Sequence, residues 1–496
     1  MSIKIYNTLT QSKTPLKTLK KNKVGMYVCG PTVYDDCHIG HLMGPVIFDS
    51  IARWLKASKY EVIFVNNITD IDDKIINKSI STGQNWLDIT KIYTQQYWDF
   101  LKELNVISIT DFPKCTDYIP QMVAYIEKLI SSGRAYEIDN GVYYEVEKQN
   151  NYGKLTKRNL EDLVSGSRVE SSSQLNHPAD FCLWKKAKPN EPFWPSPWGD
   201  GRPGWHLECS VMSNEILGET FDIHGGGDDL KFPHHENEIA QGEAHGGEYA
   251  TYWMHNGLIQ YEGIKIGKSD PRMQDKAFAN QFKARNLLDT YGADTIRFFL
   301  LQGHYRRPND FAPKNLENAK ISLHKLYNLL GKFLDNDKNE TLDQLLNRNN
   351  NDDINQSLKS FIDAMNDDFN TGLAIGHIFT MVRIVKKLGG IEKENGLKTI
   401  LYAGRILGLF PQEAFLKIID RSTITDDQAI TISNLIQSFN QEYKLNKESV
   451  MDDLLNIRQE LRSQKNYDAS DKIRDTMKEL NITIKDSPTG PTWQTK

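Results

Sequence analysis

The sequence predicts an α/β protein: a domain built on a parallel β-sheet and split by an insertion, then an α-helical bundle, then a small C-terminal α+β unit. Two short apolar runs, Val24–Val28 and Glu61–Val65, are typical of buried strands, and helical periodicity fills the stretch between them. This strand, helix, strand order is typical of α/β domains. Beyond residue 269 helical periodicity dominates, which indicates a separate helical region.

The composition is that of a soluble globular protein with several domains. The chain has 496 residues, 39% hydrophobic and 25% charged, and too many residues for one core. No apolar leader and no run near the ~18 apolar residues of a membrane span is present, so we expect no membrane association and a cytoplasmic location. Five cysteines indicate reduced thiols or metal ligands. The net charge of −5 argues mildly against a nucleic-acid partner without excluding a local basic face.

The remaining elements of the sheet domain follow from periodicity and turn residues. We expect helices at Asn85–Leu104 and Tyr118–Ser131, and an exposed strand at Gly141–Val146 that alternates polar and apolar residues. A Gly-, Pro- and Trp-rich tract closes this stretch, which therefore indicates an insertion. The sheet resumes with a strand that begins at Phe221 and ends in a glycine run, and with a strand at Thr251–Ile259.

The C-terminal half is predicted to be mostly helical. Leu287–Leu301 and Leu316–Leu330 each read as one helix, and further bundle helices lie within Phe361–Leu388 and Leu397–Leu409. Asp335–Gln356 is rich in Asn and Asp, which predicts a flexible crossing loop. After a linker at Arg421–Asp427, two short helices and an Ile482–Ile484 strand form the last unit.

His38 and His41 begin the first predicted helix, directly after the first strand. A helix N-terminus at the carboxyl end of a strand attracts phosphate through its free N–H groups and dipole. The two imidazoles could bind a polyphosphate there, and Gly40 would let a flat ring approach the backbone. The spacing alone fits ordinary helix-start histidines equally well.

Three motifs together resemble one enzyme family. Cys29-Gly-Pro-Thr-Val-Tyr34 followed by His38-Ile-Gly-His41 resembles the first signature of class I aminoacyl-tRNA synthetases, in the form found in the cysteinyl-tRNA synthetases. Lys265-Ile-Gly-Lys-Ser269 resembles their second signature, Lys-Met-Ser-Lys-Ser, with two central residues changed. Pro488-Thr-Gly-Pro-Thr-Trp493 is similar to the family's ending.

The resemblance implies a domain plan. Residues 1–310 would form a Rossmann-type catalytic domain, with halves at about 1–115 and 204–262, a connective insertion at about 116–203, and a lysine-loop and stem-contact region at 263–310. Residues 311–415 would form a tRNA-binding helical bundle, and residues 425–496 a small anticodon-binding unit.

The resemblance also implies a zinc site, one per chain, on Cys29, Cys209, His234 and Glu238. Zinc accepts thiolate, imidazole and carboxylate ligands in tetrahedral geometry. Pro233 fits the first position of a helix, which would place His234 and Glu238 one turn apart on one face. From the residues alone, the cysteines could equally be small buried hydrophobes and His234 a capping residue.

The implied activity is activation of L-cysteine with ATP and transfer to the 3′ end of tRNA(Cys). His38, His41, Lys265 and Lys268 would be catalytic. The ATP site, with Mg²⁺, would comprise His38, Gly40, His41, Gly227, Asp229, His255, Asn256, Lys265, Lys268 and Ser269. The cysteine pocket would comprise Cys29, Thr69, Trp205, His224 and Asp229.

Trp493 would approach the anticodon by stacking on an unpaired base, although anchoring of the tail to a hydrophobic core explains it equally well. Trp205 could likewise be plain packing in a Trp-rich tract. We expect a monomer. Two alternatives stay open: a ligase coupling cysteine to an amino sugar, as in mycothiol synthesis, and a non-catalytic zinc- and RNA-binding paralogue, for which only the altered lysine loop argues.

Overall fold

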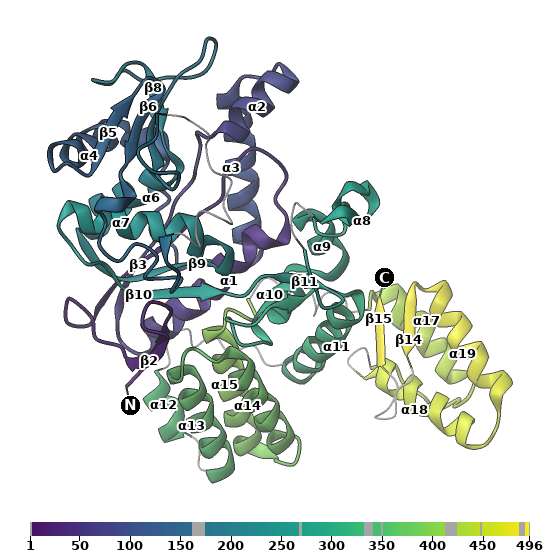
Figure 1. The fold of residues 1–496 in the computed structure, drawn as a ribbon. Helices are drawn as coiled ribbons and strands as arrows, with labels where there is room; N and C mark the ends of the chain where they lie inside the picture. The colour runs from purple at the N-terminus through teal and green to yellow at the C-terminus, as the bar shows by residue number, and fades with distance from the viewer. Residues whose placement is uncertain are drawn as a thin grey trace. The chain divides into compact units, whose positions relative to one another are not determined.

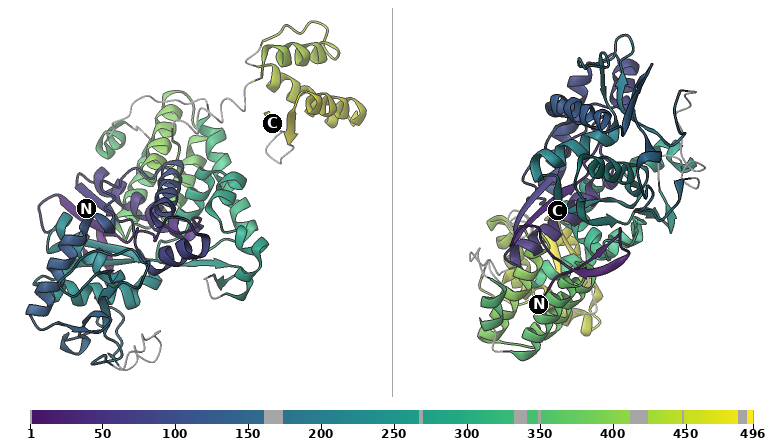
Figure 2. Two further views of the ribbon diagram at one scale, coloured as in Figure 1. Left: turned by 90° about the horizontal axis from the view of Figure 1, so that it is seen from above. Right: turned by 60° about the vertical axis from the view of Figure 1, so that its left-hand side comes forward.

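The structure is a computed structural model that describes residues 2–160, 174–266, 270–331, 341–348, 351–411, 424–446, 449–485 and 492–495. The chain separates into two compact units. The first comprises Met1–Leu326 and Asp335–Leu409, and the second comprises Tyr327–Leu334 and Phe410–Lys496. Figure 1 shows the fold coloured along the chain, and Figure 2 shows it from two further sides.

The first unit is built on a parallel sheet with the strand order β10-β9-β3-β4. Its strands are β3 (Lys23–Val28), β4 (Glu61–Asn66), β9 (Thr220–Gly227) and β10 (Tyr249–Asn256). Every neighbouring pair runs parallel, which confirms the predicted fold class. The carboxyl ends of all four strands therefore meet at one edge, where α/β proteins bind ligands.

The first helix, α1 (Ile39–Ala57), packs on this sheet through an apolar face. Its Phe48 ring lies against β9, where a Cβ atom on Gly225 would come within 2.3 Å of the ring. A Cβ atom on Gly226 would lie 2.9 Å from the His235 ring. Two of the three glycines at the end of β9 are thus required by packing within the protein.

The strand predicted at Thr251–Ile259 is wrong beyond Asn256. β10 ends there, and β11 (Ile259–Tyr261) joins a separate three-stranded sheet with β12 (Ile264–Lys265) and β13 (Asn309–Asp310). Gly257 divides the two strands because a Cβ atom at this position would lie 2.2 Å from the Arg307 carbonyl oxygen. At the N-terminus, β1 (Lys4–Asn7) and β2 (Ser12–Pro15) form a hairpin.

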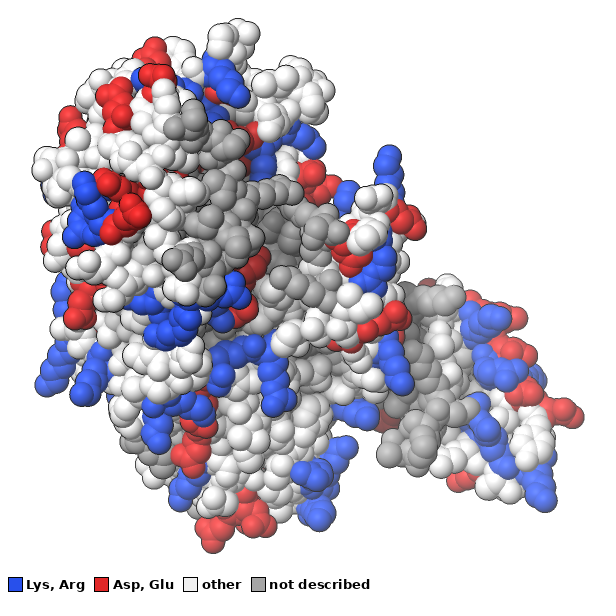
Figure 3. Space-filling model, in the orientation of Figure 1, with Lys and Arg blue, Asp and Glu red and all other residues white. Residues whose placement is uncertain are grey.

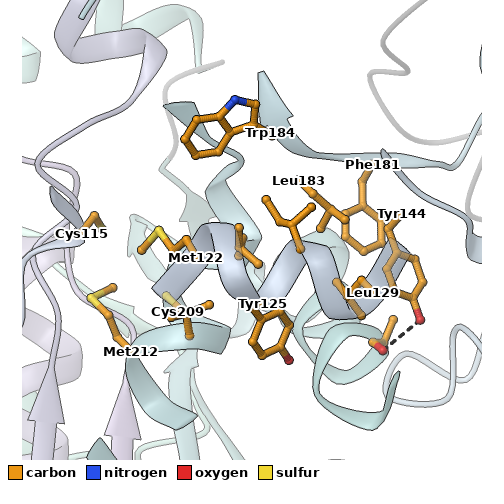
Figure 4. Packing of buried hydrophobic residues seen from close by; sticks show 14 of the residues in the cluster. Cys115, Met122, Tyr125, Leu129, Tyr144, Phe181, Leu183, Trp184, Cys209 and Met212 are labelled. Atoms are coloured by element: carbon orange, nitrogen blue, oxygen red, sulfur yellow. Dashed lines mark hydrogen bonds between the residues drawn. The ribbon is translucent and has the colours of Figure 1, made fainter. Parts of the chain in front are cut away.

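The insertion carries an antiparallel sheet of the order β5-β6-β7-β8. The predicted strand at 141–146 exists as β6 but is not exposed, because β5 and β7 flank it and all four of its residues are buried. Figure 4 shows side chains of this sheet and of α4 packed together, with Leu129 of α4 close to Phe181 of β7. Between β4 and α6 the chain forms, in order, α2 (Asp73–Thr82), α3 (Trp86–Glu103), the 3-10 helix η1 (Cys115–Tyr118), α4 (Ile119–Ser131), β5 (Ala135–Ile138), β6 (Gly141–Tyr144), the 3-10 helix η2 (Val146–Lys148), β7 (Phe181–Lys186) and β8 (Gly201–Pro203).

The helices that follow the insertion end the sheet domain. The predicted single helix at 287–301 is wrong, because Gly292 with φ of 83° divides it into α9 and α10. The elements are α6 (Trp205–Leu217), η3 (Asp228–Leu230), η4 (Lys231–His235), α7 (Glu236–His245), η5 (Pro271–Gln274), α8 (Lys276–Asn280), α9 (Ala284–Tyr291), α10 (Ala293–Leu301) and α11 (Pro313–Leu330).

The bundle at the end of the first unit consists of α12 (Leu342–Arg348), α13 (Asp352–Asn366), α14 (Thr371–Val385) and α15 (Gly390–Ile406). The flexible loop predicted at 335–356 is wrong over α12 and the start of α13; residues 335–340, 349 and 350 lie outside the described residues. The asparagine-rich composition misleads here because Asn351 caps α13, accepting a hydrogen bond from the Ile354 N–H at 3.1 Å.

The second unit has its own core of helices and a two-stranded sheet. The linker predicted to extend to Asp427 is wrong at its end, since Thr425 and Gln428 form a capping box that starts a helix at Asp426. Residues 421–423 of that prediction lie outside the described residues. The elements are α17 (Asp426–Gln437), α18 (Val450–Ser463), α19 (Tyr467–Glu479), β14 (Ile482–Lys485) and β15 (Thr492–Thr495). Among all described helices, none combines the length and apolar character needed to cross a bilayer.

Candidate active site and metal centre

The two signature histidines form the start of α1. His38 is the N-cap, and its Nδ1 accepts a hydrogen bond from the Gly40 N–H at 3.1 Å. The His41 ring stacks on the His38 ring with centroids 3.7 Å apart. A Cβ atom on Gly40 would lie 2.8 Å from the His38 ring, so the flat ring that glycine accommodates in this structure is His38 itself.

The structure brings together all four side chains for which zinc binding was predicted. Cys29 follows β3 directly, Cys209 lies on α6, His234 lies in η4 and Glu238 lies on α7. One ligand atom from each lies within 4.8 Å of the others. Three of the four are fully buried, and Cys29 is partly exposed.

The distances suit a tetrahedral ion. The Cys29 and Cys209 sulfur atoms are 3.8 Å apart, and His234 Nε2 is 3.0 Å from Glu238 Oε1. With zinc–sulfur bonds of about 2.3 Å and zinc–nitrogen or zinc–oxygen bonds of about 2.0 Å, tetrahedral geometry separates such ligands by about 3.8 Å and about 3.3 Å. The donor set therefore fits zinc in both chemistry and spacing.

The local backbone around His234 agrees with the prediction for Pro233. Phe232 has extended dihedrals and interrupts η4, so the helical segment that continues through Glu236 into α7 begins at Pro233. His234 and Glu238 therefore meet as an i and i+4 pair on this segment.

A second donor set overlaps the first and was missed from the sequence. Cys29, His224, His235 and Glu238 also offer ligand atoms within 4.8 Å of one another. Cys29 Sγ is 3.3 Å from His235 Nε2, and His224 Nε2 is 2.7 Å from Glu238 Oε2. The adjacent histidines at 234 and 235 were the only sequence signal, and nothing in their spacing indicates which one faces the cysteines.

Polar groups outside the two donor sets orient the His234 and His235 imidazoles. His234 Nδ1 lies 2.9 Å from His206 Nδ1, which leaves Nε2 as its ligand atom. His235 Nδ1 lies 2.8 Å from His255 Nε2, and His255 Nδ1 lies 2.8 Å from Thr8 Oγ1. The Tyr249 hydroxyl donates to Glu238 Oε2 at 2.9 Å, so Oε1 is the carboxylate oxygen that faces the cysteines.

The electrostatics of the site favour negative charge on two of the donors. Burial raises the pKa of the Cys29 thiol well above its ordinary value, and Cys209 and Glu238 add to the effect. Burial opposes ionisation of Cys209, but interactions with Cys29 and His234 lower the pKa of its thiol. Burial is likewise outweighed at Glu238, where His224 and His234 hold the pKa well below its ordinary range. Burial is outweighed at His234 as well, where Glu238 and Cys209 raise the pKa of the imidazole to about 10, so a divalent cation would displace that proton on binding.

Trp205 and His224, both predicted for the cysteine pocket, contact these donors. Trp205 begins α6, is 40% exposed, and stacks on His234 with ring centroids 4.3 Å apart. Thr69 is buried and hydrogen-bonds to Glu208. His224 lies beside Glu238 and is wholly buried, whereas Asp229 is exposed in η3. A hollow of about 240 Å³ adjoins Trp205 on the side of the insertion.

Several of the residues predicted for ATP binding lie at or just after the carboxyl ends of β9 and β10. Gly227 ends β9, and Asn256 ends β10 with its buried Oδ1 lacking a hydrogen-bond partner among the described residues. Both ring nitrogens of His255 contact protein groups. Lys265 ends β12, while Lys268 and Ser269 lie outside the described residues. Trp493 lies in β15, paired with Ile484 and packed against the core of the second unit.

Comparisons with known proteins bear on this arrangement. The family model described as "tRNA synthetases class I (C) catalytic domain" matches residues 15–321, and that of the DALR domain matches residues 360–411. Among solved structures, the Mycobacterium tuberculosis methionyl-tRNA synthetase bound by methionyl-adenylate has a TM-score of 0.55 at 12% identity, covering 82% of this chain and 95% of that chain. The Agrobacterium radiobacter K84 LeuRS, in a ternary complex with tRNA and LeuAMS, has a TM-score of 0.55 at 10% identity, covering 81% and 85%.

The sheet, the helix that starts at His38, and these matches define the fold of a class I aminoacyl-tRNA synthetase. The cysteine–tRNA ligase of Methanococcus maripaludis is 42% identical over 491 residues, which cover 98% of each chain. That of Thermococcus onnurineus is 41% identical over 511 residues, covering 100% of this chain and 99% of the relative. The chain belongs to the cysteine–tRNA ligase family.

Proposed function

We propose that this chain activates L-cysteine with ATP to form cysteinyl-adenylate and transfers the cysteinyl group to the 3′ end of tRNA(Cys). The observation that carries the proposal is the convergence of two cysteines, a histidine and a glutamate at the sheet edge from which the His38–His41 helix also starts. The full-length similarity to cysteine–tRNA ligases supports the same activity.

One zinc ion per chain, held by Cys29, Cys209, His234 and Glu238, is the cofactor that fits this donor set. When bound there, zinc would prefer the soft sulfur of cysteine to the hydroxyl of serine. Discrimination by a metal–sulfur bond exceeds the ~1–3 kcal/mol that a hydrophobic pocket gains from one methylene, so no editing step is needed. Thr69, Trp205, His224 and Asp229 would complete the amino-acid pocket.

The first reaction step requires alignment and charge stabilisation more than proton transfer. The carboxylate of cysteine is already a nucleophile and attacks the α-phosphorus of ATP, with pyrophosphate as leaving group. His38 and His41 at the start of α1, together with Lys265 and Lys268, would stabilise the charge that develops on the phosphates, and Mg²⁺ bound to ATP would add to this stabilisation. Gly40, Gly227, Asp229, His255, Asn256 and Ser269 would position the nucleotide.

The helical parts would bind tRNA. We assign tRNA binding to the bundle of residues 311–415 and anticodon binding to residues 425–496, with Trp493 near the anticodon. On the face drawn in Figure 3, Lys and Arg side chains are intermingled with Asp and Glu, so this face is not a uniformly basic surface for RNA. Recognition of unpaired bases by stacking needs an aromatic side chain rather than a strongly basic surface. We expect the enzyme to be monomeric and to work in the cytoplasm.

Two other activities are not favoured. The DALR domain match at 360–411, beyond the catalytic domain, argues against a ligase for an amino sugar, for which an anticodon-binding region would be superfluous. No observation besides the altered lysine loop favours a non-catalytic paralogue. Cysteine-dependent ATP–pyrophosphate exchange, followed by charging of tRNA(Cys), tests the proposal. Exchange without charging would indicate the amino-sugar ligase, and the absence of exchange would refute all cysteine activation.

A further inference from the structure

The start of α1 differs from an ordinary phosphate-binding helix end, because acceptors within the protein already occupy its first backbone N–H groups. The Ile39 N–H donates to the Phe282 carbonyl at 2.9 Å. The Gly40 N–H donates to His38 Nδ1 at 3.1 Å, and the His41 N–H donates to the His38 carbonyl at 2.9 Å. The imidazoles of His38 and His41, rather than these N–H groups, are therefore what the helix offers to a phosphate. Their direction depends on how the backbone at His38 is held.

The backbone at His38 is held by the segment 282–284, which follows the second signature motif along the chain. His38 and Lys283 form an antiparallel bridge. The hydrogen bond from Ile39 flanks this bridge on one side, and the Ala284 N–H donates to the Cys37 carbonyl at 2.8 Å on the other. The first and last residues of the segment are buried, so water does not replace these contacts. The region that carries the lysine motif is thus attached directly to the histidine motif.

Asp36 ties this segment to the opposite side of the histidine motif. Its Oδ2 accepts a hydrogen bond from Lys283 Nζ at 2.9 Å, and its Oδ1 accepts one from Gln96 Nε2 of α3 at 3.2 Å. The orientation of the Gln96 amide is determined, because its Oε1 accepts from the Cys37 N–H at 3.0 Å and a backbone N–H can only donate. Both oxygens of Asp36 are therefore used, and residues 36–38 are held between α3 and the segment 282–284.

Asp35 offers a comparison within the same loop, because it also forms an exposed ion pair. Asp35 and Lys78 of α2 lie 3.3 Å apart, with side chains 56% and 30% exposed, and the Asp36 and Lys283 side chains are 43% and 44% exposed. Hydrogen bonding to Lys283 lowers the pKa of Asp36, and Asp36 raises the pKa of Lys283. Of the two pairs, only Asp36–Lys283 joins the histidine motif to the segment that pairs with its backbone.

We propose that Asp36 is a positioning residue for the activation of the amino acid by ATP. Through Lys283 and Gln96 it holds the backbone at His38, and the direction of the His38 and His41 imidazoles toward the phosphates follows from that backbone. The inference rests on the proposed function and deepens it by adding a residue that sets the geometry of the ATP site. An exposed ion pair contributes little to stability, but a small displacement of a group that stabilises the transition state lowers the rate.

A double-mutant cycle on the full-length, zinc-loaded protein tests this assignment. D36N and K283M should each lower kcat/KM for ATP in cysteine-dependent pyrophosphate exchange about fivefold, the upper range for an exposed ion pair. The double variant D36N/K283M should also lose about fivefold, rather than the roughly 25-fold of two independent effects. K283R keeps the cation and should retain most of the wild-type value. The dissociation constant of L-cysteine, measured by calorimetry, should change by less than about twofold in every variant.

D35N and K78M are the matched controls, because they break the neighbouring pair, and both should stay within about twofold of the wild-type kcat/KM. Deuterium exchange at the Ile39 and Ala284 amides, which should be faster in D36N than in D35N, follows the backbone contacts without any activity.

Equal losses in D35N and D36N, multiplicative losses in the double variant, L-cysteine binding weakened as much as kcat/KM for ATP, or an unchanged kcat/KM in D36N would each overturn the inference. Absence of pyrophosphate exchange in the wild-type protein would instead refute the proposed function, and deuterium exchange would still show whether Asp36 holds the backbone at His38.

Discussion

The sulfur atoms of Cys29 and Cys209 lie 3.8 Å apart, although 180 positions separate the residues along the chain. Cys29 follows the strand β3, and Cys209 lies in the helix that follows the insertion. The parallel sheet brings these segments together, because strand ends from both halves of the domain share one edge. Two thiols at this distance in a chain without disulfides are the clearest structural indication of a metal centre.

We predict that the purified protein contains one zinc ion per chain and that C209A lowers its zinc affinity at least tenfold, since a ligand is lost. The measurement is metal content by atomic spectroscopy after dialysis against a mild chelator. C182A is the matched control, because Cys182 lies in β7, outside both donor sets, and should keep full zinc content. Wild-type zinc content in C209A would show that this site does not hold the metal.

The sheet was predictable from the sequence where the signal is local. β3 and β4 are short buried runs, and the glycine and proline after β3 mark its end. The zinc candidates could not be assembled in this way, since their proximity depends on the packing of α6 and α7 against the sheet. Only the resemblance to a known family joined them. His206 and His235 escaped notice because no spacing rule assigns a buried histidine to a donor cluster.

The errors have local physical causes. Helical periodicity continues from 287 to 301, but Gly292 adopts a positive φ and ends α9 after Tyr291. The Asn- and Asp-rich stretch before Gln356 reads as loop by composition, yet Asn351 starts α13 as a cap and Ile354 anchors it in the bundle core. The run at 141–146 alternates as an exposed strand would, but all four residues of β6 are buried.

Asp49 and Arg297 form a fully buried ion pair that ties α1 to α10. We predict that D49N lowers the free energy of unfolding by about 3–5 kcal/mol at pH 7, because Arg297 keeps an unpaired buried charge. Urea unfolding of the full-length protein measures the change. D367N, which breaks the exposed Lys13–Asp367 pair, should cost less than about 1 kcal/mol. Equal effects of the two substitutions would contradict this account.

The same ion pair should make the free energy of unfolding depend on pH. Burial alone would raise the pKa of Asp49, but Arg297 and Arg53 outweigh burial and hold it below its ordinary value. A carboxylate with a lowered pKa stabilises the fold above its unfolded pKa of about 3.9, and this contribution is lost as the pH falls through the folded value. The stability difference between wild type and D49N should therefore be constant near neutrality and shrink below about pH 4. A difference that grows on acidification would be inconsistent with it.

The altered lysine loop can be tested without tRNA. We predict that K268A reduces cysteine-dependent ATP–pyrophosphate exchange by about 10²-fold or more, the usual cost of removing one charge that stabilises the transition state. K276A is the control: Lys276 is exposed at the start of α8 and should leave the exchange rate within about twofold. An unchanged rate in K268A would remove this loop from the ATP site.

Substitution of Trp493 should impair tRNA recognition and leave amino-acid activation unchanged. We predict that W493A reduces charging of tRNA(Cys) about tenfold, because loss of one stacked base costs ~1–3 kcal/mol, while pyrophosphate exchange stays at the wild-type rate. Because Trp493 also packs on the core of the second unit, W493F serves as the variant that retains an aromatic ring there. Wild-type charging by W493A would leave Trp493 as an anchor of the C-terminal strand only.

The central claim is that the substrate is recognised through its sulfur at the Cys29–Cys209 centre, and X-ray absorption at the zinc edge tests it most directly. The free protein should show two sulfur ligands, with nitrogen and oxygen completing the site. Addition of L-cysteine should raise the count to three sulfur ligands and lengthen or remove the oxygen contact of Glu238, and L-serine should change nothing. A spectrum that stays at two sulfur ligands in saturating L-cysteine would contradict the account.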